Sequence, residues 1–118
     1  MRIKIDPLDN LFSIIIRRRA KSQCQRCLRY KEFGDLQCAH CFGRRKKSVR
    51  WDMDNALGLC FTCHRIIDGE DPDAKKELFV KFLGEKGYKN LRIRAEISKN
   101  YDRKLIEMFL KKELLKYE

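Results

Sequence analysis

Two Cys-x-x-Cys pairs are the residues of this 118-residue chain whose types and spacing specify chemistry most directly. The pairs are Cys24/Cys27 and Cys60/Cys63. Thiolates in two close pairs are the usual ligands of a structural zinc ion, which four sulfurs surround tetrahedrally at about 2.3 Å. The spacing therefore predicts one Zn²⁺ bound by all four cysteines, with metal binding coupled to folding.

A third pair, Cys38-x-x-Cys41, leaves a second arrangement open. Six cysteines together with His40 and His64 would suffice for two complete four-ligand zinc sites, and both histidines would then be structural. In the other interpretation, Cys38 and Cys41 are small strand residues, and one of them faces the core.

Two histidines and one asparagine form the other chemical pattern. His40, Asn55 and His64 follow one another as H-x14-N-x8-H, and His64 directly follows the second cysteine pair. Histidine exchanges a proton near neutral pH, so this pattern favours a reactive site held in place by the zinc. Each residue also has a structural reading. His64 would be a zinc ligand, His40 a buried strand residue, and Asn55 a turn residue.

The composition points to a polyanionic partner. The net charge is +11 and the isoelectric point is near 9.6, an excess of Lys and Arg that is typical of proteins that bind nucleic acid. We expect no membrane association, because the apolar run 14–16 ends at three arginines. Cysteines without a secretory signal favour metal binding in the cytoplasm over disulfides.

The hydrophobic pattern predicts a single α+β domain. Its parts are an amphipathic N-terminal helix at 8–22, a zinc-stapled core at 24–70 and a helical extension at 73–118. Within the core we expect strands at 37–42 and 56–60, followed by a helix that Thr62 caps.

The extension is expected to contain at least two helices. Asp73 caps the first, and Gly84 ends it. Residues 88–97 fit both a strand and a short helix. Asp102 opens the last helix, whose wide apolar stripe is either core or the seam of a dimer. Whether the chain is a monomer or a homodimer is therefore open.

The whole pattern resembles the zinc-containing, phage-type HNH endonucleases, which are similar to lambda-type recombination endonucleases and have the ββα-metal fold. The resemblance covers roughly residues 9–68. The motifs that carry it are DNLFS at 9–13, IRRR at 16–19, CAH at 38–40, RR at 44–45, RWD at 50–52 and Asn55.

This resemblance implies metal-dependent hydrolysis of DNA phosphodiester bonds. His40 would be the general base that activates water, and Asn55 would hold it in orientation. His64 would ligate one catalytic Mg²⁺ or Mn²⁺. The chain departs from the pattern at Ala39, where many HNH enzymes carry a second metal ligand.

A basic loop between His40 and Asn55 is expected to contact DNA. The residues are Arg44, Arg45, Lys46, Lys47 and Arg50, which would grip phosphates without reading sequence. The alternative is a mobile, solvated loop. Beside it, Trp51 is expected to cover the zinc lobe as an apolar plug rather than to stack on a base.

The resulting hypothesis is a zinc-stapled HNH endonuclease of phage or prophage origin, acting on DNA in the cytoplasm of a bacterial host. Two other hypotheses stay open. The first is a non-catalytic zinc module that binds nucleic acid through the same basic face. The second is an interaction protein whose C-terminal helices recruit a partner.

Overall fold

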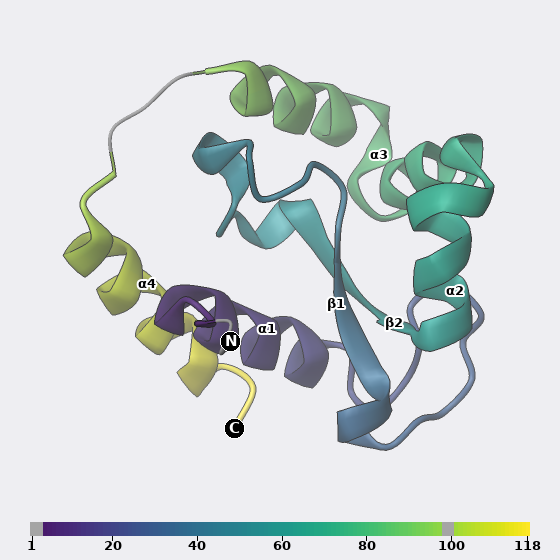
Figure 1. Cartoon of the computed structure of the whole chain (residues 1–118), viewed down its shortest axis with the longest axis horizontal. Helices are drawn as coiled ribbons and strands as arrows, with labels where there is room; N and C mark the ends of the chain where they lie inside the picture. Colours follow the sequence, from purple (N-terminus) through teal and green to yellow (C-terminus); the bar gives the residue numbers. More distant parts are fainter. Residues whose placement is uncertain (1–3, 98–100) are drawn as a thin grey trace.

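The computed structural model describes residues 4–97 and 101–118, in which helices surround a two-stranded antiparallel sheet (Figure 1). The α+β class predicted from the sequence is therefore confirmed. The longer elements are α1 (Pro7–Arg19), β1 (Leu36–His40), β2 (Ala56–Cys60), α2 (Phe61–Arg65), α3 (Pro72–Glu96) and α4 (Arg103–Leu115). The short helical turns are 3-10 turns at Phe33–Asp35, Lys47–Val49 and Met53–Asn55, and a π-helical turn at Ile66–Glu70.

The two strands form a hairpin with a long connecting loop. Their register runs from Leu36 opposite Cys60 to His40 opposite Ala56. The strand predicted at 56–60 is confirmed, and the first strand lies at 36–40 instead of 37–42. This register places the end of the first strand beside the start of the second, so the two ends of the loop meet there.

The core consists of two apolar clusters, and different helices contribute to each. The first joins α1 and α4, which lie side by side in Figure 1, and centres on Phe12, Ile16 and Leu110. The second packs α3 and α2 against the hairpin, with Leu59 and Phe79 fully buried. The N- and C-terminal helices therefore build one lobe, and the strands, α2 and α3 build the other.

Helix α1 approaches the sheet closely at its C-terminal end. A Cβ atom added to Gly58 would lie 2.8 Å from the Cβ atom of Ala20, so only glycine fits there. The helix ends at Arg19, earlier than the predicted residue 22, because Lys21 and Ser22 have positive φ angles of 54° and 59°. This left-handed turn directs the chain into the first cysteine pair.

Helix α3 starts two residues before the predicted start. Asp71 caps it by accepting a hydrogen bond from the N–H of Ala74 at 3.2 Å, and Pro72 is the first helical residue. The prediction that Asp73 is the cap was wrong for this reason. Similarly, helix α2 starts at Phe61 with Cys60 in the capping position, so Thr62 is not the cap.

Gly84 breaks the helical backbone of α3 as predicted, with φ 75° and ψ 167°. The chain then continues as a helix to Glu96, which resolves the ambiguous segment 88–97 in favour of a helix. Leu91 and Ala95 are both buried on its inner face. Their spacing of four residues is the helical period.

Helix α4 starts after Asp102, as predicted. The Asp102 carboxylate accepts hydrogen bonds from two backbone N–H groups in the first turn, at 3.0 and 3.3 Å. Leu110 is fully buried, but Leu105 is 62% exposed and Leu115 is 67% exposed. The apolar stripe is thus only partly core, and the choice between monomer and homodimer stays open.

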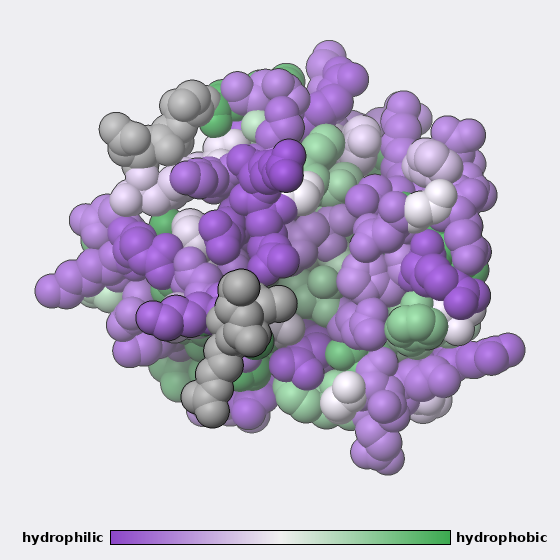
Figure 2. Space-filling view, viewed as in Figure 1, coloured by the Kyte–Doolittle hydropathy of each residue, from purple (hydrophilic) through white to green (hydrophobic). Residues whose placement is uncertain are grey.

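Hydrophilic side chains cover most of the molecular face seen in Figure 2. Among residues 4–97 and 101–118, no helix combines the length and apolar character needed to cross a membrane.

Candidate functional site

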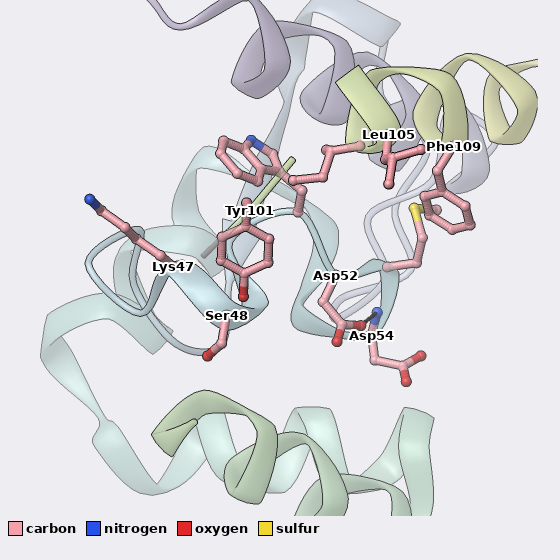
Figure 3. A pocket seen from close by; sticks show the side chains of 10 residues that line it. Lys47, Ser48, Asp52, Asp54, Tyr101, Leu105 and Phe109 are labelled. Atoms are coloured by element: carbon pink, nitrogen blue, oxygen red, sulfur yellow. Dashed lines mark hydrogen bonds between the residues drawn. The ribbon is translucent and has the colours of Figure 1, made fainter. Parts of the chain in front are cut away.

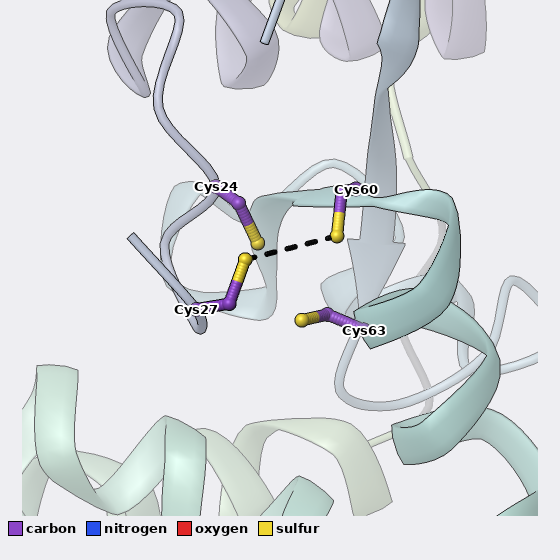
Figure 4. Close-up of side chains that lie close together, drawn as sticks. All are labelled: Cys24, Cys27, Cys60 and Cys63. Atoms are coloured by element: carbon purple, nitrogen blue, oxygen red, sulfur yellow. Dashed lines mark hydrogen bonds between the residues drawn. The ribbon is translucent and has the colours of Figure 1, made fainter. Parts of the chain in front are cut away.

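The four predicted zinc ligands lie together beside the hairpin (Figure 4). The sulfurs of Cys24, Cys27, Cys60 and Cys63 all lie within 4.8 Å of one another, and those of Cys27 and Cys60 are 3.9 Å apart. Sulfurs bound tetrahedrally at 2.3 Å are about 3.8 Å apart. The cluster therefore fits a structural metal ion such as zinc, and the prediction of these four residues as a group is confirmed.

Backbone contacts hold the first cysteine pair against the sheet. The N–H of Cys24 donates to the carbonyl of Arg29, and the N–H of Gln25 donates to the carbonyl of Gly58, both at 2.9 Å. Burial raises the pKa of the Cys24 thiol, but backbone N–H groups that donate to it outweigh this and set the pKa at about 7. Arg26 Nη1 lies 3.6 Å from the sulfur of Cys63. The donors favour the thiolate form at Cys24, whereas burial outweighs Arg26 and raises the pKa of Cys63 to about 12 in the absence of a metal.

The third cysteine pair stands apart from this cluster. Cys38 packs against the cluster of α1 and α4, whereas Cys41 belongs to the cluster of the hairpin and α3. Burial raises the pKa of Cys38 to about 12 and that of Cys41 to about 11, so both are neutral thiols. In the described part of the chain, no second group of three or more possible ligands comes together. The two-zinc arrangement finds no support.

Both histidines line one cleft of about 610 Å³. His40 reaches it from the end of β1, and His64 reaches it from α2. Arg17, Arg44 and Lys75 also line the cleft, together with Asp9 and Asp68, which pair with Arg44 at 3.5 Å and with Lys75 at 3.3 Å. The fold thus brings the two histidines of the H-x14-N-x8-H pattern to one site, beside both cations and carboxylates.

His40 is held with one ring nitrogen unpaired. Its ring packs against that of Phe12, with centroids 5.6 Å apart. Its buried Nε2 atom has no hydrogen-bond partner among residues 4–97 and 101–118. Burial lowers the pKa of His40, and nearby Arg44 and His64 lower it further, against opposing effects of the Arg50 backbone and Asp9. The imidazole is therefore neutral at pH 7 and can accept a proton.

Asn55 is fully buried and holds the loop ends together. Its Oδ1 accepts a hydrogen bond from the N–H of Phe42 at 2.8 Å. Its Nδ2 donates to the carbonyls of Phe42 and Val49, both at 2.9 Å. In addition, the N–H of Cys41 donates to the Asn55 carbonyl. Asn55 does not line the cleft, so it positions the chain directly after His40 rather than reacting.

His64 lies between an amide and a carboxylate. Its Nδ1 is 2.7 Å from Oε1 of Gln37, and its Nε2 is 2.9 Å from Oδ2 of Asp68. Because Nδ1 faces an amide oxygen, the neutral ring carries its proton on Nδ1 and presents the lone pair of Nε2 to Asp68. Two acceptor atoms at this distance require a proton or a cation between them.

The 2.9 Å between Nε2 of His64 and Oδ2 of Asp68 is the length of a charge-assisted hydrogen bond and also the spacing of two adjacent ligands of one cation. Oδ1 of Asp68 lies 3.3 Å from Nζ of Lys75. The sequence pattern did not single out Asp68, although its spacing of four residues from His64 is a usable signal. Ala39, at the position of the missing ligand, is fully buried in the core.

The predicted DNA-contacting residues lie in different environments. Arg44 lines the cleft, and its side chain is 63% exposed. The guanidinium of Arg50 instead makes a two-pronged ion pair with Asp9. Arg45, Lys46 and Lys47 line a separate hollow. Arg44 therefore faces the histidine cleft, whereas Arg50 forms an ion pair with Asp9 of α1.

Trp51 does not cover the zinc lobe. Its Nε1 donates to Asp9 at 2.9 Å, and its ring packs against the cluster of α1 and α4. The prediction of a plug over the zinc was wrong, because Asp9 attracts both this indole and the neighbouring Arg50.

The three consecutive arginines at the end of α1 have different roles. Arg17 lines the cleft and lies 4.3 Å from the centre of the Phe33 ring. Arg18 is exposed outside it. Arg19 donates to the carbonyls of Met53 and Ala56, at 2.9 and 2.6 Å. Only the first of them is placed to meet a phosphate at the histidines.

A second cleft of about 480 Å³ lies between α4 and the loop of the hairpin (Figure 3). Apolar side chains of α4, among them Leu105 and Phe109, form one wall, and Tyr101 points its hydroxyl toward Ser48. This cleft contains neither a histidine nor a cysteine, so it does not match the chemistry that the sequence predicts.

Comparisons of the chain with protein-family models, with curated proteins and with solved structures found no match. The observed features define an α+β protein with a two-stranded antiparallel sheet and a tetracysteine cluster that can hold a metal ion.

Proposed function

We propose that this protein is a zinc-stapled endonuclease of the HNH type that hydrolyses DNA phosphodiester bonds. The observation that carries the proposal is the shared cleft. His40 and His64 both line it together with three basic side chains and two carboxylates, and the buried Nε2 of His40 has no partner among the described residues. The order of strand, loop, strand and helix agrees with the ββα arrangement that the sequence resemblance implies.

His40 is the general base of this proposal. For this reaction a water molecule has to reach the buried Nε2 from the cleft; it then loses its proton to the neutral imidazole and attacks the phosphorus atom. The bond between phosphorus and the 3′ oxygen breaks, and this oxygen takes a proton from solvent, which leaves a 5′-phosphate and a 3′-hydroxyl. The lowered pKa keeps the ring neutral at the pH of the cell. Asn55 fixes the chain beyond His40 through its hydrogen bonds to Phe42.

His64 and Asp68 are the ligands proposed for the catalytic Mg²⁺ or Mn²⁺. Such an ion supplies Lewis-acid stabilisation of the charge that develops on the phosphate. Gln37 orients the His64 ring, because its Oε1 atom accepts a hydrogen bond from the Nδ1–H of that ring. Arg17 and Arg44 hold the DNA backbone at the cleft without reading the base sequence. The zinc site stays structural, since Cys60 and Cys63 bracket the start of α2 and so place His64.

A test of this proposal is the conversion of supercoiled plasmid to nicked or linear DNA with Mg²⁺, with Mn²⁺ and with neither ion. We expect cutting only with an added ion, and its loss in His64→Ala and Asp68→Asn at unchanged zinc content. Salt-sensitive DNA binding without any cutting would favour the non-catalytic zinc module. The expected phage origin and cytoplasmic location stay predictions.

A further inference from the structure

Three exposed aromatic rings lie near the cysteine pairs in the sequence. Phe61, the first residue of α2, is 61% exposed, and Tyr30 and Phe33 are 79% and 40% exposed. Each lies close in the chain to basic residues, and arginines stack on two of the rings. Arg17 lies over Phe33, and Arg65 lies over Phe61 at 5.7 Å. Exposed rings among cations are the means by which proteins hold unpaired bases of single strands.

Phe61 forms a wall of a hollow of about 310 Å³. The other residues around it include Lys31 and Asp35, which follow the first cysteine pair, and Gln37 on β1. Gln37 also lines the histidine cleft, where it contacts His64. Gln37 therefore lines both the hollow and the cleft, which gives a strand that crosses the cleft a route to the hollow.

The chemistry of this hollow suits a base better than a phosphate. A carboxylate at Asp35 repels phosphate but accepts a hydrogen bond from an amino or imino group of a base. Gln37 uses its Oε1 atom toward His64, which leaves its amide N–H groups for an acceptor. The ring of Phe61 supplies a stacking surface, and Lys31 supplies charge for the adjoining phosphate.

We infer that this hollow binds one unpaired nucleotide next to the scissile phosphate, so that the substrate is DNA with a single-stranded segment at the cut. This inference rests on the proposed function for the position of the cut, but the binding site itself does not depend on cleavage. A duplex cannot offer its bases to Phe61 without unpairing, since they are stacked inside the helix.

Binding without cleavage tests the base site first. Fluorescence anisotropy with the zinc-loaded protein, without added Mg²⁺ or Mn²⁺, would compare a short labelled single strand with its duplex. We expect Phe61→Ala to weaken single-strand binding by about 5- to 150-fold, the range of one base–aromatic stack, and to leave duplex binding unchanged. Phe61→Tyr should retain binding, because tyrosine keeps the stacking face.

Phe109→Ala is the matched control. Phe109 is a 48% exposed phenylalanine on α4, at a distance from α2 in Figure 1, and its loss should change neither affinity. Unchanged single-strand binding by a folded, zinc-loaded Phe61→Ala protein would overturn the inference. An equal loss of single-strand and duplex binding would also overturn it.

Cleavage then separates this inference from the proposed function. Substrates with a gap or a flap should be cut faster than an intact duplex, and Phe61→Ala should remove that preference. If Phe61-dependent binding is found but no substrate is cut, the nuclease proposal fails and the base site stands. If His40-dependent cutting shows no preference for unpaired DNA, the nuclease proposal stands and the base site fails.

Discussion

Replacing Asn55 by alanine tests the role of the hydrogen bonds that close the hairpin loop. The change removes three side-chain hydrogen bonds and leaves the N–H and carbonyl of Phe42 and the carbonyl of Val49 without these partners. Each such bond contributes about 1 kcal/mol, and a buried group left unpaired costs up to about 3 kcal/mol. We therefore expect the free energy of unfolding to fall by about 3–5 kcal/mol.

The loss is measurable as a shift in the unfolding midpoint. For a domain of this size it corresponds to a decrease in Tm of roughly 10–20 °C, and urea unfolding would give the free energy directly. Hydrogen exchange would locate the effect, because the amide of Phe42 should lose protection. Asn90→Ala is the control, since Asn90 is exposed on α3 and its replacement should be close to neutral.

A Tm of Asn55→Ala within about 2 °C of the wild-type value would refute this reasoning. It would mean that water replaces the three hydrogen bonds without cost, and that the loop is not held by Asn55. The same result would remove the structural basis for treating Asn55 as the residue that positions His40.

Three further results follow from the site. Cys60→Ser should abolish binding of the single zinc per chain and lower the helical circular dichroism, whereas Cys38→Ser should retain full zinc content by elemental analysis. The lowered pKa of His40 means that below its usual value of 6.5 the unfolded chain takes up a proton that the folded protein does not. Stability should therefore fall as the pH drops from 6.5 toward the folded pKa, and His40→Gln should show a weaker decline; parallel curves would contradict this. Arg17→Ala should weaken DNA binding and reduce the slope of log K against log salt by about 1. Arg18→Ala, which lies outside the cleft, should change both the affinity and this slope less.

Much of the fold was predictable from local patterns. The strand at 56–60 and the cap at Asp102 follow directly from apolar runs and helix-start signals. At the start of α3 the prediction of Asp73 as the cap was wrong, because Pro72 is the first helical residue and Asp71 therefore stands in the capping position. The segment 88–97 fits both the period of a strand and that of a helix. The burial of Leu91 and Ala95 in one cluster with the hairpin agrees with the helix.

The end of α1 illustrates what local patterns do not contain. Lys21 and Ser22 adopt positive φ angles that neither residue type signals, because the turn has to deliver Cys24 to the other cysteines. Tertiary contacts, not propensity, impose this conformation.

The candidate site was predictable where spacing alone decides it. The four cysteines come together as expected, and the two histidines meet in one cleft. The ion pair of Arg50 was not predictable, since its partner Asp9 lies on a distant helix and no local rule connects them. Burial of Ala39 likewise depends on the packing of the hairpin, and only the fold shows that Asp68 faces His64.

Cleavage by the His40→Ala protein tests the central claim most directly. Under single-turnover conditions with Mn²⁺, removal of a general base should reduce the rate of DNA cleavage by about 10²- to 10⁴-fold. Zinc content and DNA affinity should stay close to wild type, whereas the Tm should fall moderately because the His40 ring packs against Phe12. Cleavage at the wild-type rate, or loss of zinc on this substitution, would contradict the assignment of His40 as the base.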